Sequence, residues 1–352
     1  MSVKLKDKFL GCIAGAHIGS AFGAAVEGWP GEKVREKYGV INKLEKYGNP
    51  DHWERMPGTT EDGIERQKFM ITAIIEKKDR ITADDVRDRW VRDMNRQAPG
   101  NISEPFEAIL LALAETNVPG RDIGKFGDYS LGTNSFTRSC HPIGLINAGD
   151  VKGARDNVLE VGQLYQRTAN RSLQWAVVTG VSIASACKPN ATVDSVIGDV
   201  LDNTDPDLVV KELSRMLKAT EKCTTIDEIR AEFDKVYNAY GMTYAFCYAN
   251  ETAVKGLCIF QFAKGNVKDA IVTAANCYRD TDCACAVAGG ITGALAGPAG
   301  IPDDWFVQMD KALEANKFTH NKRTIRQDAD LLYNAFLERL KKINSYADLM
   351  DY

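Results

Sequence analysis

The sequence lacks the features that mark nucleic-acid-binding, membrane-spanning or secreted proteins. Its 352 residues include 44 Lys and Arg against 48 Asp and Glu, and a net charge of −4 leaves no basic footprint for nucleic acid. The longest apolar stretch, Ala284 to Ile301, consists mostly of Gly and Ala and is broken by Pro298, so it is too weakly hydrophobic for a membrane span. Charged residues from Lys4 onward leave no signal-peptide pattern. We therefore expect a protein that binds neither nucleic acid nor a membrane.

The cysteines also lack a functional spacing. Nine are scattered along the chain without a Cys-x-x-Cys pair, and an odd number is inconsistent with complete disulfide pairing. Most stand among apolar residues or among Gly and Ala, as buried free thiols do. We therefore expect free thiols and a cytoplasmic location.

Apolar residues recur every three to four positions along most of the chain, whereas alternation with a period of two is nearly absent. The polar residues Thr82 and Ser103 stand where helix N-caps are expected. We therefore predict an all-α protein. No Pro/Gly/Ser-rich linker divides the chain, so a single domain over residues 1–352 is expected. The polar stretch around 188–205 is predicted to be a long surface loop. The helical stripes lie at residues 9–22, 64–77, 83–95, 103–115, 172–187, 207–218, 226–239, 252–264, 267–277, 283–297 and 326–342.

Two of the predicted helices carry glycines on one face. Gly11, Gly15, Gly19 and Gly23 are spaced by four residues, and a similar series runs through 289–297. Each glycine inside a helix costs about 1 kcal/mol relative to alanine. The series therefore indicate either helix backbones that approach each other closely or simply two well-packed core helices.

Three acidic clusters flank these helices or open another one. They are Glu27, the turn Thr60-Glu61-Asp62, and the turn Asp280-Thr281-Asp282. Taken singly, carboxylates at a helix start are typical N-caps that complement the helix dipole. Taken together, carboxylate and hydroxyl oxygens are the donors that Mg²⁺ and Mn²⁺ prefer. The five carboxylates are enough for one or two ions if the three segments converge.

Four segments in this order resemble the ADP-ribosylglycohydrolase family, and together they cover most of the chain. Its opening pattern G-x-x-x-G-D-x-x-G-x-x-x-E, its metal turn T-D-D-T, its middle segment N-G-x-x-M-R-x-x-P-I-G and its C-terminal G-D-T-D-T each have a counterpart. An Ile-Pro-x-x-Trp sequence follows the last segment, as in the family. The counterparts are Gly15–Glu27, Thr60–Gly63, Asn134–Gly144 and Arg279–Cys283, with Ile301–Trp305 after them.

The resemblance implies an all-α fold with one or two Mg²⁺ or Mn²⁺ ions in a central cleft. It implies that the metal ligands come from both acidic turns, and that Asn134, Ser135 and Arg279 bind substrate. Glu27 and Asp62 are the expected catalytic residues, since a carboxylate would take the proton from a metal-bound water. Carboxylates would also stabilise an oxocarbenium-like transition state. The expected metal ligands are Thr60, Glu61, Asp62, Asp280 and Asp282.

The chain departs from the family pattern around the metal. Ser20 and Glu61 replace aspartates, Gly63 replaces a threonine, and Arg279 replaces a glycine. Cys283 stands where a hydroxyl ligand is usual. Because a thiol is a poor ligand for Mg²⁺ or Mn²⁺, Cys283 is left out of the predicted set, and a second ion is expected to be weak, shifted or absent. Arg279 is expected to pair with Asp280 or to meet a substrate anion.

Three functions follow from this interpretation. The first is hydrolysis of the N-glycosidic bond to ribose in an ADP-ribosylated protein or small molecule. The second is hydrolysis of a simpler N-riboside, such as a nucleoside, by the same chemistry. The third is a catalytically inert binding or structural relative, which would be marked by loss of the acidic ligands. The sequence does not indicate the oligomeric state.

Overall fold

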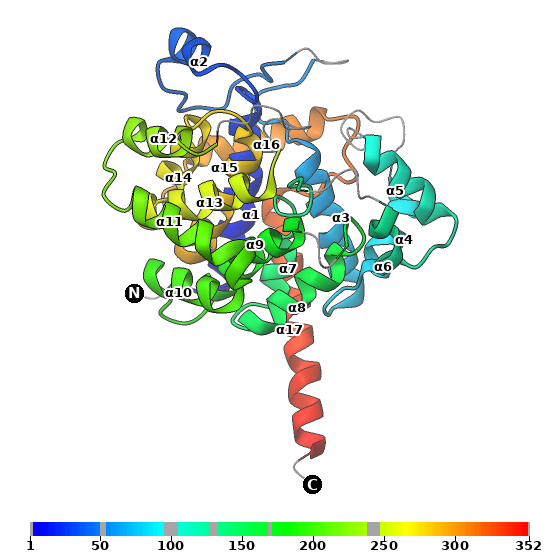
Figure 1. The fold of residues 1–352 in the computed structure, drawn as a ribbon. Coiled ribbons are helices and arrows are strands. Elements are labelled where there is room, and N and C mark those ends of the chain that lie inside the picture. The colour runs from blue at the N-terminus through cyan, green and yellow to red at the C-terminus, as the bar shows by residue number, and fades with distance from the viewer. Residues whose placement is uncertain are drawn as a thin grey trace.

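The fold consists of packed α-helices in every part that the computed structural model describes, namely residues 3–49, 54–94, 105–126, 132–167, 171–237 and 247–350 (Figure 1). These ranges contain no β-strand and only one isolated bridge, between Thr133 and Tyr248. The all-α prediction is confirmed. The α-helices are α1 (Leu5–Ala24), α2 (Gly31–Tyr38), α3 (Asp62–Lys77), α4 (Ala83–Asp93), α5 (Pro105–Glu115), α6 (Gly120–Ile123), α7 (His141–Ile146), α8 (Val151–Gly162), α9 (Arg171–Ala186), α10 (Val193–Asn203), α11 (Lys211–Thr220), α12 (Ile226–Asp234), α13 (Ala249–Ala263), α14 (Val267–Ala275), α15 (Thr281–Ala296), α16 (Asp303–Ala315) and α17 (Ile325–Met350).

Each apolar stripe in the sequence corresponds to a helix, but the predicted surface loop at 188–205 is wrong. Residues Val193–Asn203 form α10, which begins at a capping box between Thr192 and Ser195. Val196 and Val200, four residues apart, are buried and attach this short helix to the core. Thr82 caps α4 as predicted, through a reciprocal pair of hydrogen bonds with Asp85. Ser103 lies outside the described residues.

Helices α1 and α15 run antiparallel through the middle of the molecule with their glycine faces in contact (Figure 1). A Cβ atom added to Gly15 would lie 2.0 Å from the carbonyl oxygen of Gly289, and one added to Gly19 would lie 2.4 Å from that of Cys285. At the far end, Gly23 faces the first turn of α15 in the same way. The close approach of two backbones is therefore confirmed. It fixes the C-terminal end of α1 beside the N-terminal end of α15.

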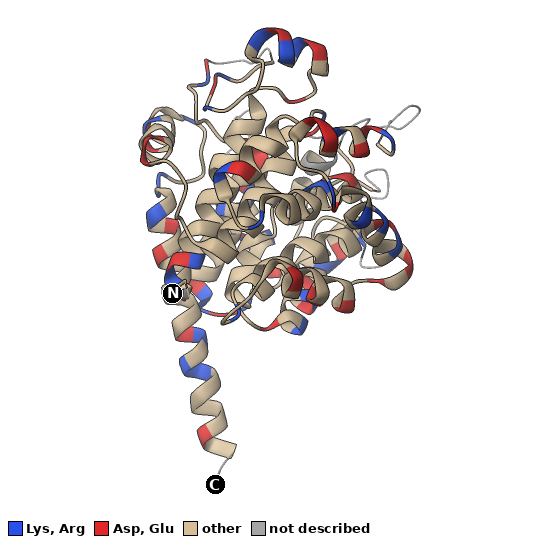
Figure 2. Cartoon of the chain, turned by 90° about the vertical axis from the view of Figure 1, so that its left-hand side faces the viewer, with Lys and Arg blue, Asp and Glu red and all other residues tan. Residues whose placement is uncertain are grey.

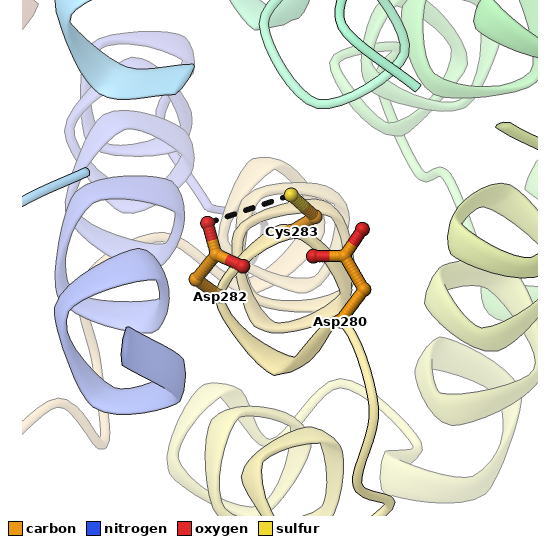
Figure 3. Close-up of side chains that lie close together, drawn as sticks. All are labelled: Asp280, Asp282 and Cys283. Atoms are coloured by element: carbon orange, nitrogen blue, oxygen red, sulfur yellow. Dashed lines mark hydrogen bonds between the residues drawn. The ribbon is translucent and has the colours of Figure 1, made fainter. Parts of the chain in front are cut away.

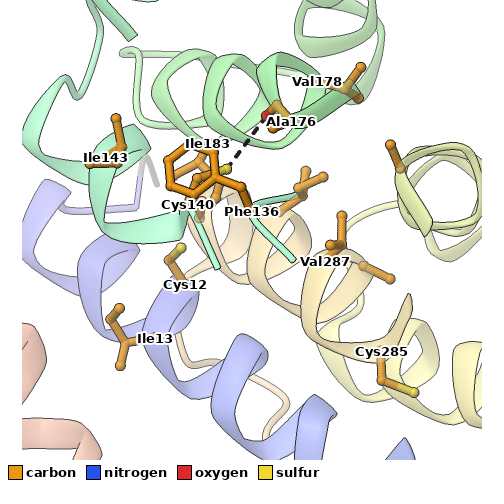
Figure 4. Close-up of a cluster of buried hydrophobic side chains, with 14 of the residues drawn as sticks. Cys12, Ile13, Phe136, Cys140, Ile143, Ala176, Val178, Ile183, Cys285 and Val287 are labelled. Atoms are coloured by element: carbon orange, nitrogen blue, oxygen red, sulfur yellow. Dashed lines mark hydrogen bonds between the residues drawn. The ribbon is translucent and has the colours of Figure 1, made fainter. Parts of the chain in front are cut away.

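The core forms around this pair of helices. Cys12 of α1 points toward a cluster that includes Ile143 of α7 and Ile183 of α9, with Val287 of α15 also in the core (Figure 4). Charged residues gather on the outer helices and on the distal part of α17, which projects from the body as an isolated helix (Figure 2).

Among the described helices, none combines the length and apolar character needed to cross a bilayer. The nine cysteines are all free thiols.

Candidate metal centre

Two helix N-termini present carboxylates that do not cap their own helices. Glu61 is the N-cap residue of α3 and Asp280 is the N-cap residue of α15, yet neither side chain accepts a hydrogen bond from its first turn. Asp62, by contrast, accepts the backbone N–H of Gly63 at 2.9 Å. The N-cap alternative therefore fails for Glu61 and Asp280, whose carboxylates contact groups outside their own helices. The positive ends of two helix dipoles still favour negative charge here.

Arg138 joins the two acidic turns. Its Nη2 donates to Oδ2 of Asp62 at 2.5 Å, and its Nη1 lies 4.0 Å from Oδ2 of Asp282. All three side chains are buried. Gly63, where the family pattern has a threonine, leaves room for the side chain of Arg138, because a Cβ at position 63 would lie 3.0 Å from Cδ of Arg138. Carboxylates from α3 and α15, far apart in the sequence, therefore face one guanidinium.

At the start of α15, Asp280, Asp282 and Cys283 form a compact set of buried side chains (Figure 3). One potential ligand atom from each lies within 4.8 Å of the other two. The thiol of Cys283 donates to Oδ2 of Asp282 at 3.4 Å. Oδ1 of Asp282 is buried and has no hydrogen-bond partner among the described residues. An unpartnered buried carboxylate oxygen is costly, so this set fits a bound cation.

The pKa values show that the carboxylates act on one another. Burial is the largest cause that raises the pKa of Glu27 well above its ordinary value, and repulsion from Asp282, Glu61, Asp280 and Asp62 adds to it. Burial also raises the pKa of Glu61 to about 8, against the attraction of Arg55. A cation placed among these groups would relieve both the burial cost and the repulsion. The three acidic segments therefore converge, as the interpretation of the sequence required.

The other predicted site residues have different surroundings. Asn134 donates to Oδ2 of Asp280 and to Oγ1 of Thr252 at 2.5 and 2.9 Å, so it holds an acidic side chain in place. Ser135 is buried beside it, and its carbonyl oxygen accepts from Oγ of Ser139. Thr60 is half-buried and lines a small internal cavity on the side of α3.

Arg279 makes a different contact from the one expected with Asp280. Its Nε and Nη2 donate to the two carboxylate oxygens of Glu251, at 2.6 and 2.8 Å. Its backbone has a φ of 70°, in the left-handed region, and Glu251 is also paired with Lys255. Binding of a substrate anion by Arg279 stays a prediction.

Two arginines of the site were not assigned a role from the sequence. Arg55 is ion-paired with Glu61 and stacks on the ring of Tyr47, with its guanidinium carbon 4.0 Å from the ring centroid. No sequence signal marks this pair. Arg138 belongs to the middle segment that resembles the family, and its position in that segment was the available signal. Both guanidinium groups lie where they neutralise acidic side chains.

Comparisons with known proteins agree with the all-α fold and with the family resemblance. A solved structure described as an ADP-ribosylglycohydrolase-related protein complex superposes with a TM-score of 0.67, covering 94% of this chain and 99% of that one. At 18% identity this likeness shows the fold alone. No curated protein matches the chain. The sequence matches the family model described as ADP-ribosylglycohydrolase over residues 1–341. This chain therefore belongs to the ADP-ribosylglycohydrolase family.

Proposed function

We propose that this protein is a hydrolase that requires a divalent cation and cleaves the N-glycosidic bond to ribose in an ADP-ribosylated substrate. The convergence of Glu27, the 61–62 turn and the 280–282 turn is the observation that carries the proposal. Membership of the family supports glycohydrolase chemistry. The mutual effect of these carboxylates on the pKa of Glu27 supports their acting as one centre.

The donor set suits a divalent ion. Asp62, Asp280 and Asp282 would hold it, with Glu61 and Thr60 contributing from the turn before α3. Mg²⁺ and Mn²⁺ are the ions that such oxygen donors favour. When bound, the ion would lower the pKa of a water molecule and orient it and the ribose hydroxyls for reaction at the anomeric carbon.

The side chains around that position supply the remaining chemistry. Burial and the neighbouring carboxylates raise the pKa of Glu27 well above its ordinary value, so it holds a proton more firmly than an ordinary glutamate and is suited to act as a general acid or base. The carboxylate of Asp62 would stabilise positive charge on the ribose ring in an oxocarbenium-like transition state. Asn134 keeps Asp280 oriented through its hydrogen bond. Asn134, Ser135 and Arg279 are proposed to contact the substrate.

A hydrolysis assay tests the function and separates it from the alternatives. The protein is incubated with an ADP-ribosyl-arginine peptide and with a panel of nucleosides, first with a chelator and then with excess divalent ion. We expect ADP-ribose release that depends on the ion and is lost in Asp282→Asn. Cleavage of nucleosides alone would replace the proposal with the simpler N-riboside function. No cleavage and no ion binding at millimolar concentration would identify an inert relative.

A further inference from the structure

The thiol of Cys283 lies inside the candidate metal centre. Cys283 is in the first turn of α15, and its Sγ is within 4.8 Å of a carboxylate oxygen from both Asp280 and Asp282. All three side chains are buried, so solvent does not screen them (Figure 3). An ion held by the two aspartates therefore also meets the sulfur.

A second observation points to a ligand at this place. Asp282 is 3% exposed, and its Oδ1 has no hydrogen-bond partner among the residues that are described. In Figure 3 one oxygen of Asp282 is bonded to the thiol, and the other is directed toward Asp280. The unpartnered oxygen thus faces the space between the two aspartates and the sulfur. A bound ion would satisfy it.

Without an ion, burial and the carboxylates of Asp280 and Asp282 raise the pKa of the Cys283 thiol well above its ordinary value, so the thiolate forms only when the charge of a bound ion offsets them. Nη1 of Arg138 lies 3.5 Å from Sγ of Cys283 and can donate to it. The N-terminus of α15 adds the positive end of a helix dipole, which stabilises thiolates. Thiolate is a soft ligand that favours zinc and similar transition metals, whereas Mg²⁺ prefers oxygen.

We propose that Cys283 binds the ion as a thiolate together with Asp280 and Asp282, so that the site selects a thiophilic divalent ion such as Zn²⁺ or Co²⁺ over Mg²⁺. As the ion–sulfur bond forms, the S–H bond breaks and its proton leaves to the solvent, with no change of oxidation state. The inference rests on the ion site of the proposed function and refines the identity of the ion.

The carboxylates of the α3 turn already have cationic partners, which explains why the ion would bind near Cys283 on α15. Glu61 is already ion-paired with Arg55, and Asp62 with Arg138. Resident cations therefore neutralise the carboxylates of the α3 turn. Asp280 accepts a hydrogen bond from the uncharged amide of Asn134, and Arg138 lies farther from Asp282, at 4.0 Å, than from Asp62. The cluster on α15 is the part of the site where a cation gains most.

Cobalt spectroscopy and calorimetry test the proposal on the full chain without substrate. The protein is stripped with a chelator and titrated with Co²⁺, and a thiolate-to-cobalt charge-transfer band is expected in the near ultraviolet. Cys283→Ser should abolish the band and weaken Zn²⁺ binding by at least about tenfold, while Mg²⁺ binding is retained or strengthened. The matched control is Cys285→Ser, because Sγ of Cys285 is directed to the carbonyl of Ile271. It should leave the band intact.

Each outcome decides between the two proposals. Bound cobalt without the band, or a band that survives in a folded Cys283→Ser variant, overturns thiolate ligation but leaves the hydrolase proposal standing. An intact band in a protein that cleaves no ribosylated substrate overturns the hydrolase proposal and supports thiolate ligation. Failure of Co²⁺, Zn²⁺ and Mg²⁺ to bind overturns both. Thermal melting of each variant shows whether it has folded.

Discussion

Asp62 and Asp282 begin different helices, and both carboxylates face the same guanidinium, that of Arg138. The two acidic turns thus form one electrostatic unit even without an added ion. Removing either carboxylate changes the surroundings of the other. Mutations at this centre are therefore expected to be strongly non-additive.

Replacement of either aspartate should abolish most of the activity. We expect Asp62→Asn and Asp282→Asn each to reduce kcat/KM by at least about 100-fold, since changes to residues that merely support metal ligands already cost 10–100-fold. The double variant should be little worse than either single one, because both residues serve the same ion. Steady-state assays with the ADP-ribosyl peptide measure this. Asp348→Asn on the exposed part of α17 is the control, and additive losses would show that the two aspartates act independently.

The stability of the ion-free protein should fall as the pH rises. Folded Glu61 keeps its proton up to a pKa of about 8, whereas its ordinary value is 4.5. The folded state therefore binds more protons than the unfolded state between about pH 4.5 and 8, and the free energy of unfolding decreases across that window. The ionised carboxylates bind a divalent ion best, so the rise in Tm that the ion causes should grow over the same range. Thermal melts in chelator and in excess ion at several pH values test both trends. A Tm of the ion-free protein that increases over this range contradicts the prediction.

Gly15→Ala should destabilise the protein severely. The new methyl group would lie 2.0 Å from a backbone oxygen of α15, and neither backbone can move without repacking the core. The expected loss is about 1–3 kcal/mol or more in the free energy of unfolding, measured by urea denaturation. Gly198→Ala is a matched control within another helix, where nothing lies within 4 Å of the added Cβ. It should stabilise α10 by up to about 1 kcal/mol, and equal effects of the two changes would contradict the close helix contact.

Arg138→Lys should destabilise the ion-free protein, because the two acidic side chains depend on the guanidinium of Arg138. A lysine keeps the charge but lacks the planar fork that reaches two carboxylates. The loss of one charged hydrogen bond is expected to reduce the free energy of unfolding of the ion-free protein by about 1.5–3 kcal/mol. An added divalent ion should restore part of this loss, because its charge would compensate for the contact that the carboxylates lose with Arg138. Melting curves with and without ion test this against Arg155→Lys, which alters a partly exposed arginine paired with Asp156.

The sequence allowed the helices and the acidic centre to be predicted for different reasons. The amphipathic helices could be predicted because their buried residues recur with the helical period of 3.6, as Leu213, Met216, Leu217 and Thr220 do in α11. Helix α10 carries such a stripe in Val193, Val196, Ile197, Val200 and Leu201. The loop prediction followed instead from the polar residues that flank this stripe on both sides. The carboxylates were identifiable because the acidic turns stand in the order in which the family's motifs occur.

The partners of the arginines were not predictable in this way. An arginine side chain is long, and its partner depends on which elements the fold brings near it. Arg279 adjoins Asp280 in the sequence, yet it pairs with Glu251 on α13. Arg55 and Arg138 reach Glu61 and Asp62 from segments whose placement only the tertiary structure supplies.

The antiparallel contact of α1 with α15 fixes one edge of the centre. Glu27 and the 280–282 turn are attached to backbones that touch, so an insertion or a bulkier residue there would displace the reacting groups. The segment between α2 and α3, which carries Tyr47, meets the same part of the molecule at Gly48, where an added Cβ would lie 2.1 Å from the carbonyl oxygen of Ala25. A side chain at Gly48 should therefore disturb the position of Glu27, two residues after Ala25, as a side chain on the glycine face would.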